Sequence, residues 1–330
     1  MPLCTFLSGG LDSSIISRIA SDGAKSHGRR LCTYSVDYTD NDKFFKESLF
    51  QPNKDSDYIS LISNYIGSKH KNIVLDNKAV AHALEESTEA RSLPGFTDVD
   101  SSLLLFCREV QREQTVALSG ECADEIFGGY PWYHNKDILF EETFPWSRSI
   151  DVRQSILKPG LLKNGGEFVH EKYLETVKSA SYLESDSKTE RRMREMFMLN
   201  MDWFMQTLLM RKDMMSMHCS LEVRVPFCDY RIVEYAYNMP WKHTLLNRRA
   251  AGKRVCFAGL LKTNFPMKLR GAKKVLIPKH TIPYILKRFA KWRKPCLPIK
   301  PRPCTKCLTR RKSANLCAIR TPCLSLGTGN

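Results

Sequence analysis

The sequence predicts an α/β fold in which a doubly wound parallel sheet is joined to a mainly helical subdomain. Short apolar runs alternate with helical patterns over about the first 135 residues. Two of these runs end in a Ser-Gly turn, and the periodicity beyond about residue 140 is mainly helical. Strands that alternate with helices in this way form parallel sheets with helices on both faces.

The predicted elements follow one another closely along the chain. The apolar run at 3–7 ends in a glycine turn, and Ile15, Ile16 and Ile19 then recur at helical spacing. We therefore expect a strand, a glycine loop and a helix in that order. Further strands are expected at 31–36, 72–75 and 115–118, and further helices at 58–65, 77–91, 101–113 and 193–217.

The 330 residues carry a formal net charge of +16 that is distributed very unevenly. Residues 248–330 contain 22 Lys or Arg and no Asp or Glu, whereas residues 1–247 contain 29 of the 51 basic residues and all 35 acidic ones. The body is therefore mildly acidic and the tail strongly basic. Because the excess charge lies in the tail, we do not expect nucleic acid to be a partner of the body.

The amino-acid pattern indicates a cytoplasmic protein with no membrane partner. No stretch reaches the roughly 18 to 20 apolar residues of a membrane span, and residues 1–10 lack the basic and apolar regions of a signal peptide. In that compartment the twelve cysteines are expected to stay reduced. Cys4, inside the first predicted strand, is expected to be buried rather than catalytic.

A glycine-rich loop follows the first predicted strand and reads Ser8-Gly9-Gly10-Leu11-Asp12-Ser13-Ser14. Its glycines let backbone N–H groups approach an anion, and the helix that follows presents its positive end. The loop lacks the Gly-Lys-[Ser/Thr] ending of a Walker A motif, and Asp12 suits a Mg²⁺ ion that bridges to phosphate. An isolated Ser-Gly-Gly would more simply be a helix-capping turn.

Two further blocks carry polar residues at the ends of predicted elements. The first contains the second Ser-Gly turn and reads Leu118-Ser119-Gly120-Glu121-Cys122-Ala123-Asp124-Glu125-Ile126-Phe127-Gly128-Gly129-Tyr130. The second reads Arg211-Lys212-Asp213-Met214-Met215-Ser216-Met217-His218, followed by Ser220-Leu221-Glu222-Val223-Arg224-Val225-Pro226-Phe227-Cys228-Asp229. In an open parallel sheet, ligands bind beyond the carboxyl ends of the strands, where both Ser-Gly turns are expected.

Together the three blocks resemble the synthetase part of the asparagine synthetases, within the ATP pyrophosphatase (PP-loop) family. The second block resembles their LSGEGADE-FGGY segment with Cys122 in place of glycine, and the third resembles RxDRMSM…SLEVRVPFLD with Met214 in place of arginine and Cys228 in place of leucine. The resemblance covers roughly residues 3–243. It implies a fold like that of the adenine nucleotide alpha hydrolases.

The resemblance implies amidation of aspartate to asparagine. In that reaction the aspartate β-carboxylate attacks the α-phosphorus of ATP, pyrophosphate leaves, and ammonia displaces AMP from β-aspartyl-AMP. The implied cofactors are ATP and Mg²⁺, the substrates are aspartate and ammonia, and the glutaminase is expected to be a separate domain or subunit. Two alternatives stay open: an inactive truncated remnant that binds ATP, and another PP-loop amide or β-lactam synthetase.

The resemblance also implies a role for each motif residue. Pyrophosphate is expected to contact Ser8, Gly9, Gly10, Ser13 and Ser14. Mg²⁺ is expected at Asp12 and Asp124, and adenosine at Leu7, Val36, Ser119 and Gly120. Glu121 is expected to act in forming the intermediate and in the ammonia step, and Arg211 to contact aspartate or phosphate. Structural alternatives are a helix cap for Glu121, a helix-to-strand junction with an ion pair for Glu222 and Arg224, and caps for Asp98, Asp100 and Ser101.

The domain prediction places the ATP-binding domain at 1–247, with an α/β part to about 135 and a helical part over 136–247. The tail, 248–330, is expected to be poorly ordered and to result from a frameshift. Codons that can encode 277–286 read PKTHNPVYL when two bases are dropped, which resembles a segment of the family. By the same offset Lys273 and Lys274 survive the shift. The open alternatives are a basic nucleic-acid-binding arm and a zinc site at Cys304, Cys307, Cys317 and Cys323.

Overall fold

A computed structural model describes residues 2–41, 56–95, 98–155, 157–158 and 160–241, all within one compact unit, Met1–Ile282. The predicted tail, with Lys273, Lys274 and the cysteines of the alternative zinc site, lies outside the described residues. Among the helices that are described, none has both the length and the apolar character needed to cross a membrane.

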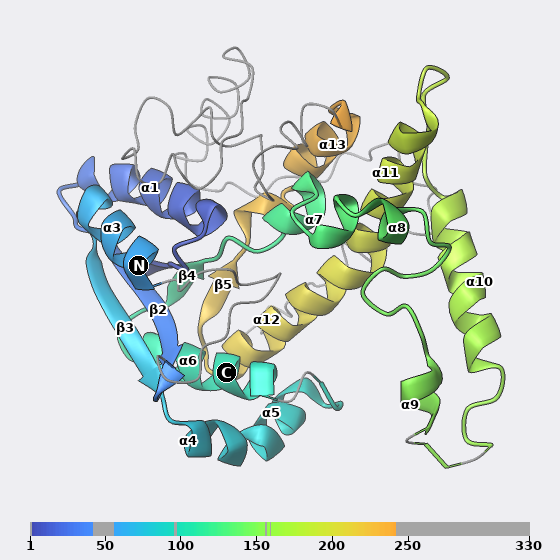
Figure 1. The fold of residues 1–330 in the computed structure, drawn as a ribbon. Coiled ribbons are helices and arrows are strands. Elements are labelled where there is room, and N and C mark those ends of the chain that lie inside the picture. The colour runs from blue at the N-terminus through green and yellow to red at the C-terminus, as the bar shows by residue number, and fades with distance from the viewer. Residues whose placement is uncertain (1, 42–55, 96–97, 156, 159, 242–330) are drawn as a thin grey trace, which may run out of the picture. The chain divides into compact units, whose positions relative to one another are not determined.

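Parallel strands form the centre of the fold (Figure 1), in the order β3-β2-β1-β4-β5. They are β1 Leu3–Phe6, β2 Cys32–Tyr38, β3 Lys69–Leu75, β4 Val116–Leu118 and β5 Glu222–Arg224. From β1 the chain passes outward to β2 and β3, then returns to β4 on the other side of β1. The order therefore reverses between β1 and β4, and such a switch point is where α/β sheets bind ligands. The predicted α/β class is confirmed.

Strand β5 lies in the third motif, where the sequence allowed a helix-to-strand junction, but its place in the sheet was not predicted. It pairs in parallel with β4, and its residues come from the part of the chain assigned to the helical region. It has only three residues, two of them exposed, although apolar and polar residues alternate over 221–225. The boundary between the α/β and helical parts near residue 135 stays a prediction, but one strand of the sheet, β5, comes after that boundary in the sequence.

Helices cover both faces of the sheet because strand residues alternate in direction. On one face, Thr5 of β1 forms a 2.7 Å hydroxyl–hydroxyl hydrogen bond with Ser17 of α1. On the other, Cys4 and Tyr34 belong to an apolar cluster with Phe106 of α6. The helices of this region are α1 Leu11–Lys25, α3 Ser56–Ile66, α4 Asn77–His82, α5 Leu84–Arg91 and α6 Asp98–Gln111.

A larger apolar cluster joins helix α1 to the helical elements. Ile15 and Ile16 of α1 share it with Trp132, Phe197 and Trp241, all nearly fully buried. The remaining elements are α7 Ala123–Phe127, η1 Pro131–Tyr133, α8 Lys136–Leu139, α9 Asp151–Ser155, α10 Gly165–Lys178, α11 Lys188–Leu199, η2 Asn200–Met205, α12 Gln206–His218, η3 Pro226–Cys228 and α13 Tyr230–Asn238.

The helix predicted over 193–217 is found as one helical run from α11 through η2 to α12. The middle segment, η2, is a π-helix. π-Helical turns are frequent near functional sites, and this one leads directly into α12. The suggested caps before α6 are wrong for two residues, since Asp100 and Ser101 lie inside that helix. Asp100 pairs with Arg91 at 3.4 Å, and Ser101 bonds to Ser87.

The cysteines differ in part from the sequence-based expectation. Cys4 is fully buried in β1, as predicted. Cys122 and Cys228, however, form a disulfide across a sequence separation of 106 residues, so the expectation of reduced thiols is wrong for this pair. The free cysteines among the described residues are Cys4, Cys32, Cys107 and Cys219.

The half-buried His70 of β3 makes the fold acid-sensitive. Its ring nitrogens lie 3.0 Å from the hydroxyls of Thr33 and Ser35, and burial lowers the pKa of His70. The unfolded chain therefore binds the proton more tightly, so stability is full above about pH 6.5 and falls as the pH drops. We expect His70→Gln to flatten the pH dependence of the unfolding midpoint below about pH 6.5. His82→Gln, at an exposed histidine of α4, is the matched control, and an unflattened His70→Gln profile would contradict this account.

Candidate functional site

The two predicted Ser-Gly loops meet at the switch point of the sheet. A Cβ atom added to Gly120, just after β4, would lie 2.7 Å from the backbone nitrogen of Ser13 and 3.1 Å from the carbonyl carbon of Asp12. Only glycine permits this approach, which puts the β4 loop against the first turn of α1. Residues more than a hundred positions apart therefore form one edge, as the sequence predicted.

Hydrogen bonds between residues close in sequence shape the loop between β1 and α1. The Ser13 hydroxyl lies 3.0 Å from that of Ser8 and donates to the Gly10 carbonyl at 3.2 Å, and the Ser14 hydroxyl donates to the same carbonyl at 2.6 Å. Gly9 has a φ of 72°, a left-handed conformation suited to glycine. Gly10 has no side chain to cap α1, so the positive end of the helix faces this loop without a capping side chain, as suits an anion.

The positions assigned to adenosine lie around this loop. Leu7 is buried beneath α3, so it would contact adenosine through its backbone. The backbone is held in place by the Leu7 N–H, which donates to the Tyr34 carbonyl at 2.8 Å. Val36 lies in the later half of β2 and exposes 40% of its surface, which leaves an apolar face for a ring. Ser119 is buried where β4 ends, and its N–H donates to the Arg224 carbonyl at 2.9 Å.

The predicted catalytic residues, 90 positions apart, lie together. The Arg211 Nη2 atom on α12 is 3.5 Å from the Oε1 atom of Glu121. Lys212 extends from the same helix, and its Nζ atom lies 3.1 Å from that oxygen. Two cations therefore flank one carboxylate near the loop between β1 and α1. The cluster of Glu121, Arg211 and Lys212 has a net positive charge, which suits anionic substrates.

Sequence reasoning missed Lys212, although it was part of the third motif. The side chain is only 8% exposed, and its ammonium also lies 5.3 Å from the ring centroid of Phe6 at the end of β1. Buried lysines are rare unless paired, and its position next to Arg211 made it resemble an ordinary surface charge. Glu125 was also missed; it is buried, accepts a hydrogen bond from Tyr130, and burial raises its pKa.

Both predicted metal ligands lie in first helical turns at this edge, Asp12 in α1 and Asp124 in α7. Helix α7 starts from Cys122, whose φ of 75° explains why the related motif has glycine there. Over the described residues, no three His, Cys, Asp or Glu side chains gather as a ready-made metal site. A magnesium ion would therefore complete its shell with phosphate oxygens and water.

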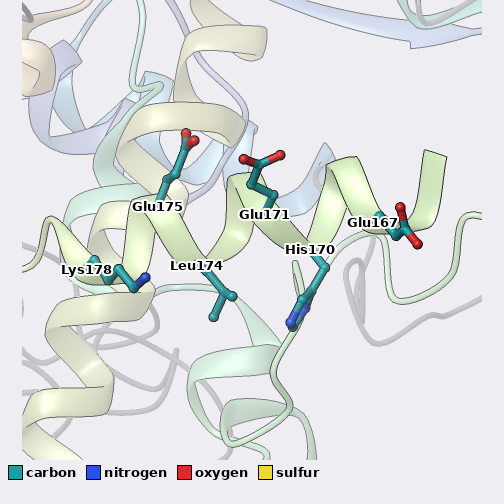
Figure 2. Close-up of a pocket in the computed structure, with 6 residues that line it drawn as sticks. All are labelled: Glu167, His170, Glu171, Leu174, Glu175 and Lys178. Atoms are coloured by element: carbon teal, nitrogen blue, oxygen red, sulfur yellow. The ribbon is translucent and has the colours of Figure 1, made fainter. Parts of the chain in front are cut away.

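Other motif residues lie away from this cluster. The Glu222 and Arg224 side chains form an exposed ion pair at 2.7 Å in β5, which agrees with the structural alternative. A pocket along α10 is lined by Glu167, His170, Glu171, Leu174, Glu175 and Lys178 (Figure 2). All six residues come from one helix and none from a motif, so we place the site at the strand ends.

Comparison with known proteins agrees with the motif geometry. A family model described as Asparagine synthase matches residues 1–272. The chain belongs to the asparagine synthase family. The match extends beyond residue 247, where the tail was predicted to begin, and the domain boundary at that residue stays a prediction. The frameshift stays a prediction about residues that the structure does not describe.

Two curated relatives within the asparagine synthase family illustrate the extent of the match. Asparagine synthetase [glutamine-hydrolyzing] 3 of Bacillus subtilis is 45% identical, over 89% of this chain and 48% of the relative. Asparagine synthetase [glutamine-hydrolyzing] 1 of the same organism is 27% identical, over 73% and 41%. The chain therefore spans about half the length of these relatives.

A solved structure described as a predicted subunit of a tRNA methyltransferase from Methanocaldococcus jannaschii is also similar. It is 17% identical, covers 57% of this chain and 80% of its own, and has a TM-score of 0.25. The fold assignment therefore rests on the strand order given above.

Proposed function

We propose that the chain catalyses the ATP-dependent amidation of aspartate to asparagine through β-aspartyl-AMP, with release of AMP and pyrophosphate. The observation that carries the proposal is the contact of the two Ser-Gly loops at the switch point, next to Glu121 and its two cations. Membership of the asparagine synthase family supports the substrate class. We also propose that the protein acts in the cytoplasm.

The chain's residues are proposed to act mainly by positioning and charge. The N-terminal end of α1 and the hydroxyls of Ser8 and Ser13 hold the phosphates, while Arg211 holds an anionic group of aspartate or phosphate. Asp12 and Asp124 would hold Mg²⁺, which neutralises charge on the departing pyrophosphate. Glu121 would accept a proton as ammonia attacks.

Ammonia is proposed as the direct nitrogen donor. It would reach the site either free or from a glutaminase domain or subunit. The β-carboxyl group must be adenylated first because a carboxylate resists attack by a nucleophile, and AMP then serves as the leaving group.

Aspartate-dependent release of pyrophosphate from ATP, measured with ammonium chloride present, tests the proposal. We expect one asparagine for each pyrophosphate, and about a hundred-fold lower rates in Asp12→Asn because the metal loses a ligand. Asp22→Asn is the matched control, since Asp22 lies on the same helix and pairs with Arg18, one turn earlier on α1. Absence of aspartate-dependent pyrophosphate release would indicate an inactive remnant, and release with another carboxylic acid a different amide synthetase.

A further inference from the structure

The two positions at which cysteine replaces the residue of the asparagine synthetase motifs lie next to each other in space. Cys122 stands where the second motif has glycine, and Cys228 where the third has leucine. Their Cα atoms are 5.8 Å apart, within the usual range for disulfides, and their sulfurs are bonded. Two unrelated replacements would not be expected to lie within bonding distance of each other, so the geometry indicates that the two cysteines act as a pair.

Cysteine is an unfavourable choice at position 122 unless it makes a bond. The residue has a φ of 75°, where glycine is unstrained and a residue with a Cβ atom is not. Cys122 is only 1% exposed, so a role for its thiol at the protein surface does not explain the replacement. The disulfide gives the replacement a physical reason.

From this geometry we propose that Cys122 and Cys228 are a reversible redox-modification site that fastens the loop carrying Glu121. The bond ties the residue after Glu121 to η3, which follows β5. On its other side the loop is fixed by Gly120 against Ser13. Oxidation therefore holds both ends of this short segment, and reduction frees one of them.

Low-molecular-weight disulfides are the proposed oxidant class. Cys228, which is partly exposed, attacks one sulfur of such a disulfide and releases the first small thiol. Cys122 then attacks the Cys228 sulfur and releases the second. Two protein thiols and one small disulfide thus become one protein disulfide and two small thiols, with two electrons passing to the oxidant. Small thiols reverse the exchange.

Three of the four free cysteines among the described residues, Cys4, Cys107 and Cys219, are poorly suited to the same chemistry. Burial raises the pKa of the Cys107 thiol to about 12 and raises that of Cys4 further. Burial likewise raises the pKa of Cys219. Thiolates are the reactive species, so these residues exchange slowly. Cytosolic disulfides are usually transient and redox-sensing, which agrees with a reversible link in a cytoplasmic protein.

Thiol mapping of the full-length chain tests whether the pair forms. The protein is incubated with oxidised or reduced glutathione, alkylated, digested and analysed by mass spectrometry. We expect a linked peptide that contains Cys122 and Cys228 only after oxidation. The control variant Cys32→Ser should give the same result, because it keeps both cysteines of the pair. Complete alkylation of both cysteines after oxidation would overturn the proposal.

Hydrogen exchange and thermal unfolding test what the bond does. We expect reduction to lower the unfolding midpoint of the wild type by about 5 °C or more and to speed exchange in residues 119–128. Neither change is expected in Cys122→Gly/Cys228→Leu, which restores the motif residues, nor in the second variant Cys228→Ser. Equal responses in the wild type and in these variants would overturn the proposal.

Discussion

Replacing Gly120 by Ala is expected to reduce pyrophosphate release by about a hundred-fold or more. The added Cβ atom would lie 2.7 Å from the backbone nitrogen of Ser13, a distance that real Cβ atoms do not tolerate. Because the opposing atoms are backbone, one loop must move, and a displacement near 1 Å is enough to misplace reacting groups. The overpacking also costs about 1 to 3 kcal/mol of stability.

The matched control for this substitution is Gly23→Ala on helix α1. Apart from its chain neighbours and the backbone of its own helix, no atom lies within 4 Å of a Cβ atom built at Gly23, and the residue is helical. We expect that variant to keep full activity and to gain about 0.5 to 1 kcal/mol, because glycine is a poor helix residue. Nucleotide affinity measured by calorimetry and turnover are compared in both variants. If Gly120→Ala bound ATP and turned over like the wild type, contact between the loops would not matter for function.

The sequence predicted this loop contact because its causes are local. Each loop directly follows a short apolar strand, and parallel strands bring their carboxyl ends to one edge of a sheet. Glycine at 9 and 120 indicated unusual backbone geometry, which is found as a positive φ at one and a close approach at the other. Resemblance to known motifs then assigned the chemistry, and the alternation of strands and helices predicted the layers.

Long-range pairings could not be predicted in the same way. Strand β5 pairs with β4 from more than a hundred residues away, and the alternation of its residues does not indicate which strand it pairs with. Sequence alone cannot pair cysteines, so Cys122 and Cys228 were noted as departures but not as partners. Burial of Lys212 depends on the packing of α12 against α6 and β5, which no local pattern encodes.

Replacing Glu121 by Gln is expected to lower turnover by about a hundred-fold while nucleotide affinity changes little. Glutamine keeps the shape of the side chain and can still accept a hydrogen bond from Lys212, so the loop should remain in place. It carries no negative charge to balance Arg211 and Lys212 and cannot accept a proton from the attacking ammonia. Glu222→Gln, at an exposed carboxylate of β5, is the control and should be fully active.

Comparison with Lys212→Met separates a positioning role for Lys212 from a direct one. We infer that Lys212 acts through Glu121, because its ammonium lies 3.1 Å from the same Oε1 atom that Arg211 approaches. Lys212→Met alone should then lower turnover, and Lys212→Arg should restore part of it. In the double variant with Glu121→Gln, the loss should equal that of Glu121→Gln alone, since residues that act as a unit are not additive. Losses that multiply in the double variant would mean that Lys212 contacts substrate on its own, and a fully active Glu121→Gln would remove the carboxylate from the reaction.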